Sequence, residues 1–171
     1  MSRYLSLVIV ALLARAASAD DPTKPREPTA KVKKHLGERA LHVLAKPTRL
    51  ELFEIGVPRG GKIEHRVGRW PAKGPGLEVK QAVALKLAAV LRDEQTYFGD
   101  GLPADPFFPT HAFRLWREKE SLDVIFNARS GLFQIHVRDA EGKVIKELRI
   151  NPYLRRLRDL QQEALKERKE K

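Results

Sequence analysis

The sequence predicts an α+β protein with a single antiparallel sheet of about four to five strands, two packed helices and a short N-terminal helix. Three observations lead to this class. The chain has 171 residues, 42% of them hydrophobic, which is enough to bury one core. Some segments repeat apolar residues at helical spacing, and others alternate apolar and polar residues as strands do. No segment recurs at a fixed period, which excludes a solenoid.

Residues 1–19 have the three-part pattern of a secretory signal peptide. A positive residue precedes a nearly apolar run at 5–14, and small residues at 17–19 favour cleavage after Ala19. As a helix this run would reach only about 15 Å, roughly half the hydrocarbon core of a bilayer. We therefore expect an exported, periplasmic or extracellular protein that begins at Asp20 and has no transmembrane span after cleavage. The alternative is an N-terminal helix of a cytosolic domain.

Residues 20–30 predict a flexible, proline-rich leader. The stretch holds three prolines and five charges and has no large apolar residue to bury. We expect residues 31–171 to form one α+β domain that ends in a charged C-terminal tail.

The first half of this domain alternates helix and strand patterns. Apolar residues at helical spacing predict a helix over 32–45, which Pro47 ends. Alternation predicts a first strand over 50–55. A second strand is expected near 63–70, within a segment rich in glycine and proline. The apolar stripe and the alanines of 78–92 predict a helix that covers the sheet.

The second half reads as a meander followed by a helix. Residues 96–109 hold four aromatic side chains and predict a long ordered loop. Strands are then expected at 111–117, 122–127, 132–138 and 144–150. Asn151 and Pro152 are a typical helix start, so we expect the last helix at 153–166.

The residue inventory excludes several kinds of chemistry. The chain has no cysteine, which excludes disulfides, thiolate metal sites and a cysteine nucleophile. Its five histidines form no metal-binding motif, and neither a nucleophile elbow nor a phosphate loop is present. We therefore expect no metal site and no cofactor. A non-catalytic binding or accessory module is favoured over an enzyme.

Two candidate ligand surfaces follow from strand alternation and from local charge. His136 alternates with apolar neighbours and should face away from the core, on the polar face of the sheet. The second candidate is a basic segment with an aromatic residue that could stack on a ligand. The predicted ligand-binding residues are Arg114, Trp116, Asp123 and His136 on the sheet, and Arg69 and Trp70 in the basic segment. The simpler interpretations are a hydrated sheet face and a hairpin with solvent-facing cations.

The charge balance leaves the partner open. Lys and Arg number 33 against 22 Asp and Glu, a formal charge of +11 that is spread along the chain. In an exported protein this favours an anionic envelope polymer, or another exported protein, over specific nucleic-acid binding. One alternative function is non-specific polyanion binding at the cell envelope. Another is a hydrolase-like enzyme that the fold assembles from His111, His136 and Asp123.

Three segments resemble a family of small exported bacterial proteins of unknown function. They read ALHVLAKPTRLELFEI, VKQAVALKLAAVLRDEQTYFGDG and FFPTHAFRLWREKESLDVIF. The resemblance covers about 40–137 and implies export and a shared fold. Family members commonly carry cysteines near the positions that are here 105–109 and 126–129. These are absent, so no disulfide, metal or redox role is carried over.

Overall fold

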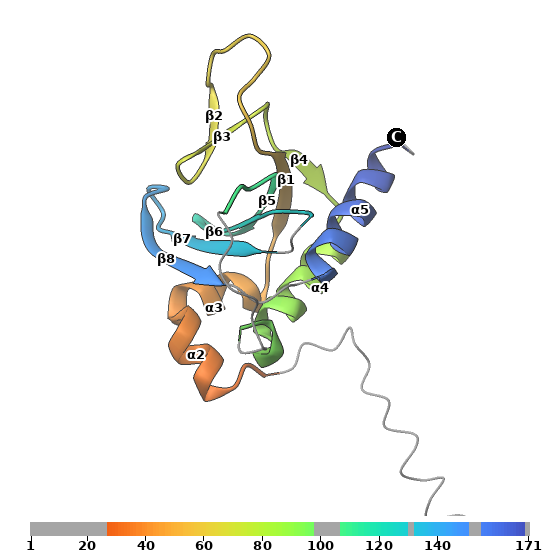
Figure 1. The fold of residues 1–171 in the computed structure, drawn as a ribbon. Coiled ribbons are helices and arrows are strands. Elements are labelled where there is room, and N and C mark those ends of the chain that lie inside the picture. The colour runs from red at the N-terminus through yellow and green to blue at the C-terminus, as the bar shows by residue number, and fades with distance from the viewer. Residues whose placement is uncertain (1–26, 98–106, 130–131, 151–154, 170–171) are drawn as a thin grey trace, which may run out of the picture.

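The structure is a computed structural model that describes residues 27–97, 107–129, 132–150 and 155–169. Helices cover one face of an antiparallel sheet, and a small hairpin lies against the other face (Figure 1). The helices are α2 (Ala30–Leu36), α3 (Glu38–Ala45), α4 (Gln81–Arg92) and α5 (Arg155–Lys169), with a 3-10 turn η1 (Glu94–Thr96). The strands are β1 (Arg49–Glu54), β2 (His65–Val67), β3 (Trp70–Ala72), β4 (Leu77–Val79), β5 (His111–Arg117), β6 (Glu120–Phe126), β7 (Phe133–Arg138) and β8 (Val144–Ile150). The predicted α+β class is confirmed.

The large sheet has six strands in the order β4-β1-β5-β6-β7-β8, and every neighbouring pair is antiparallel. Its last four strands form the expected meander. The expectation of four to five strands was too low. Leu77–Val79 forms an edge strand on β1, where the sequence pattern predicts the beginning of the helix. The helix itself starts only at Gln81.

The expected second strand is a hairpin of its own. His65–Val67 pairs with Trp70–Ala72 in a separate two-stranded sheet, and Val67 lies opposite Trp70. The turn between them needs a residue with positive φ, which Gly68 supplies at 59°. The segment predicted as one strand over 63–70 therefore turns back on itself.

The described residues hold four α-helices rather than two and a short one. The predicted helix over 32–45 is broken at Gly37, whose φ of 83° and ψ of 165° are not helical. Its N–H still bonds the Lys33 carbonyl at 2.9 Å and so closes α2. Asn151 and Pro152, the predicted start of the last helix, lie outside the described residues. None of the described helices has the length and apolar character needed to cross a membrane.

The main core lies between the sheet and the helices. In β5, β6 and β7 the middle positions of the helix-facing side are buried and apolar, as in Phe113, Leu115, Leu122, Val124 and Ile135. On β8, Leu148 packs against this core. The α4 stripe of Val83, Leu87 and Leu91 is wholly buried in the same core. Burial of each such side chain contributes roughly 1.5–3 kcal/mol.

A second, smaller core lies on the other face. Val67 and Ala72 of the hairpin are fully buried and pack on the sheet. Their partners are Phe53, Ala112 and Ile125. The hairpin is therefore a docked layer, and it covers part of the face that the sequence predicts to be polar.

Candidate functional site

The polar residues of the sheet line up in one row on the face that carries the hairpin. Cross-strand pairing places one of them on each of the six strands. In strand order the row is Glu78, Glu51, Arg114, Asp123, His136 and Glu147. Three of the predicted site residues are thus direct neighbours, as the alternation of the strands implied.

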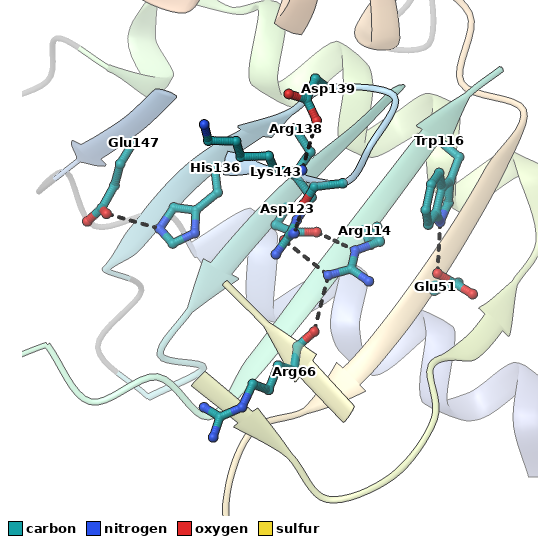
Figure 2. A network of polar contacts seen from close by, with 11 residues as sticks. Glu51, Arg66, Arg114, Trp116, Asp123, His136, Arg138, Asp139, Lys143 and Glu147 are labelled. Carbon is teal, nitrogen blue, oxygen red and sulfur yellow. Dashed lines mark hydrogen bonds and ion pairs between the residues drawn. The ribbon is translucent and has the colours of Figure 1, made fainter. Parts of the chain in front are cut away.

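Asp123 is the centre of the row. Its side chain is fully buried and accepts hydrogen bonds from two arginines, as Figure 2 shows. Arg114 donates from Nε to Oδ1 at 2.5 Å and from Nη2 to Oδ2 at 3.1 Å. Arg138 donates from Nε to Oδ2 at 2.7 Å. Such charge-assisted pairs are geometrically specific, so the carboxylate fixes both guanidinium groups in place.

His136 lies next to Asp123 and is 2% exposed. Neither ring nitrogen has a hydrogen-bond partner among the described residues, and Nε2 is 3.7 Å from Glu147 Oε2. Desolvation by burial lowers the pKa of His136, although the carboxylates of Glu147 and Asp123 oppose this shift. The ring is held by packing: a Cβ placed on Gly68 of the hairpin would lie 2.5 Å from Nδ1.

Trp116 lies at the edge of the polar network around Asp123, and its ring contacts two other residues of the protein. Its Nε1 donates to Glu51 Oε2 at 2.8 Å, and the Arg49 guanidinium lies over its ring at 4.7 Å. An open hollow of about 490 Å³ adjoins it, lined by Thr48, Lys119 and other polar residues. The Arg49 guanidinium therefore covers part of the ring of this predicted ligand-binding residue.

The two surfaces predicted separately are parts of one region. Arg114 on the sheet donates from Nη2 to the Arg66 carbonyl of the hairpin at 3.4 Å (Figure 2). Above it, the Arg69 guanidinium covers the Trp70 ring at 4.9 Å, and Trp70 makes an edge contact with Phe107 at 6.2 Å. Trp70 thus faces the sheet, whereas the Arg69 side chain is exposed.

The residues of the hydrolase alternative do not converge. His111 pairs in register with Phe126, which lies on the helix-covered face, and its ring stacks on Phe126. Its ring nitrogens contact Thr110 Oγ1 at 3.0 Å and Gln161 Nε2 at 3.1 Å. Desolvation lowers the pKa of His111. His136 lies on the opposite face, so the two histidines cannot act on one substrate atom.

Several residues of the network were outside the sequence prediction. Arg138 shares Asp123 with Arg114, and Glu51 and Arg49 hold Trp116. Alternation places these residues on the same face, but only the register between distant strands brings them into contact. Arg66 takes part through its backbone carbonyl, and the residue type at a position does not predict such a backbone contact.

The described part of the chain contains no cluster of three His, Asp or Glu side chains that could hold a metal ion. No protein-family model, curated protein or solved structure matches the chain.

Proposed function

We propose that this protein is an exported, non-catalytic binding module that takes an anionic partner on its β2–β3 hairpin. The observation that carries the proposal is a group of five exposed cations on this element and its loop. They are Arg59, Lys62, Arg66, Arg69 and Lys73.

Most of this charge is available to a ligand. Lys62 pairs with Glu64 at 2.9 Å and Lys73 with Glu54 at 2.5 Å, both at the surface. Within the described residues, none of the other three cations lies within 4.0 Å of a carboxylate oxygen. Residues 56–73 contain five cations and one acid, a net charge of 5 − 1 = +4. This local excess favours an anionic partner more strongly than the average of the chain does.

The layer beneath the hairpin supports binding rather than catalysis. The Asp123 carboxylate is fully buried and accepts three hydrogen bonds from two arginines. The hairpin is fixed to the sheet by Val67 and by the bond to the Arg66 carbonyl. This carboxylate therefore holds protein groups in place and is not exposed to a ligand. The network instead holds the cationic surface in one arrangement, which reduces the entropy lost on binding.

Export is the second part of the proposal. It is supported by the signal-peptide pattern of residues 1–19, which lie outside the described residues. Cell fractionation with intact-mass analysis tests it. We expect a chain that begins at Asp20 in the exported fraction; a cytosolic chain that retains Met1 would contradict export.

The test of binding removes the three cations that make no ion pair among the described residues. We expect Arg59→Gln/Arg66→Gln/Arg69→Gln to bind immobilised dextran sulfate about tenfold more weakly than the wild type, since three exposed ion pairs of about 0.2–1 kcal/mol each contribute roughly 0.6–3 kcal/mol together. The matched control is Lys34→Gln/Lys46→Gln/Lys166→Gln, which removes three exposed cations from the helical side. An equal loss of affinity in both variants would show that binding depends only on the net charge of the protein. Unchanged affinity in the arginine variant would refute the proposal.

A further inference from the structure

We propose that the anionic partner is a lipid bilayer, and that the loop between β1 and β2 is the part that enters its interface. This inference rests on the proposed function. Its first support is the position of the loop, which projects beyond the sheet (Figure 1). A Cβ placed on Gly60 or Gly61 would have no heavy atom within 4 Å, so the tip stands clear of the rest of the protein.

The tip combines apolar and cationic side chains. Val57 is 62% exposed and Ile63 is 39% exposed, and these two residues flank Arg59 and Lys62. Residues 56–63 contain no acid, and the acid that follows them, Glu64, is exposed and pairs with Lys62 at 2.9 Å. A soluble polyanion would use only the two cations. A bilayer with anionic headgroups uses both kinds of side chain, because the apolar ones leave water at the level of the headgroups.

The backbone presents these side chains in a defined arrangement. The Gly61 N–H bonds the Pro58 carbonyl at 2.9 Å, which closes a turn over Arg59 and Gly60. This turn sets Val57 before the bend and Ile63 shortly after it. The backbone of Arg59 and Gly60 is therefore held in a turn at the tip of the loop.

A protein partner fits this surface less well. A stable protein interface buries about 800 Å² on each side, around a central group of well-packed apolar or aromatic residues. Among the residues that the structure describes, the other exposed large apolar side chains are Leu85 of α4, Phe108 before β5 and Ile145 of β8. The apolar surface of the loop is thus limited to two side chains, which suits shallow insertion.

Lipid co-sedimentation tests the inference on the processed chain that begins at Asp20, because residues 1–19 would insert on their own. Vesicles are made of phosphatidylcholine alone or of phosphatidylcholine with phosphatidylglycerol. We expect binding only when phosphatidylglycerol is present. We expect Val57→Ser/Ile63→Ser to lower that affinity about tenfold, because two apolar side chains that would be partly buried in the bilayer interface are lost. The control is Leu85→Ser, which removes an exposed leucine from α4.

Binding of the same proteins to dextran sulfate separates this inference from the proposed function. We expect the Val57/Ile63 variant to bind dextran sulfate as the wild type does. Wild-type protein that binds dextran sulfate but no anionic vesicle would overturn the lipid inference and leave the cationic binding surface in place. Undiminished vesicle binding by the double variant would also overturn it. Wild-type protein that binds neither would overturn both.

Discussion

Asp123 shows at the scale of one residue how the polar face is held together. Its buried carboxylate compensates two guanidinium groups that are 14% and 15% exposed, those of Arg114 and Arg138. We expect Asp123→Asn to lower the free energy of unfolding by about 3–5 kcal/mol, because it leaves these charges without a counterion. Urea unfolding measures the loss. Glu64→Gln, which breaks an exposed pair with Lys62, should cost less than about 1 kcal/mol. Equal losses of unfolding free energy in the two variants would show that the buried ion pairs of Asp123 stabilise the fold no more than an exposed pair does.

We expect His136 to make the free energy of unfolding depend on pH. Burial lowers the pKa of His136 in the folded protein, so the unfolded chain binds the proton more readily. The free energy of unfolding should therefore fall as the pH decreases below about 6.5, the pKa of an unperturbed histidine. The groups around the ring are Asp123, Glu147, Arg138 and Arg69; the first two oppose the shift and the arginines increase it.

Urea unfolding at about pH 7.5 and about pH 5.5 measures this dependence. We expect His136→Gln to weaken the pH dependence without abolishing it, because burial also lowers the pKa values of His35 and His111. An unchanged pH dependence in this variant would contradict the assignment to His136.

At the scale of the element, the β2–β3 turn depends on one glycine. Gly68 has a φ of 59°, and a Cβ there would meet the His136 ring. We expect Gly68→Ala to cost about 1–3 kcal/mol, from the strained backbone and from displacement of the hairpin or the ring. Gly60→Ala is the matched control, since a Cβ has open space there and φ is not in the left-handed region. It should be neutral or stabilise by up to about 1 kcal/mol. Similar effects of both changes would argue against a docked turn.

The elements also show how far sequence patterns reach. Alternation located β1 and the meander because each of these strands has one face in the main core. It missed β4, whose three residues are too few to show a pattern and are held by pairing with β1. The helix predicted over 32–45 included Gly37, because the helical spacing of apolar residues continues on both sides of this break. The docking of the hairpin depends on contacts between residues far apart in the chain, which no local pattern reports.

At the scale of the whole molecule, the two faces of the sheet are covered by different elements and bury cores of different size. The helices bury the main core on one face. The hairpin on the other face buries a small core, covers the Asp123 network and turns its cations outward. The sequence predicted the class, the sheet face and the neighbouring Arg114, Asp123 and His136. It could not predict that Arg69 and Trp70 belong to the same region, because that depends on the hairpin folding over the sheet.

The measurement that tests the central claim most directly is the amide NMR spectrum of the isotope-labelled processed chain during titration with dextran sulfate. The binding surface proposed here predicts that the largest shifts fall on the loop and hairpin, between residues 57 and 69. Signals of α2 and α3 should stay nearly constant. Largest shifts around Thr48 and Trp116, at the open hollow, would contradict the claim that the hairpin is the binding element.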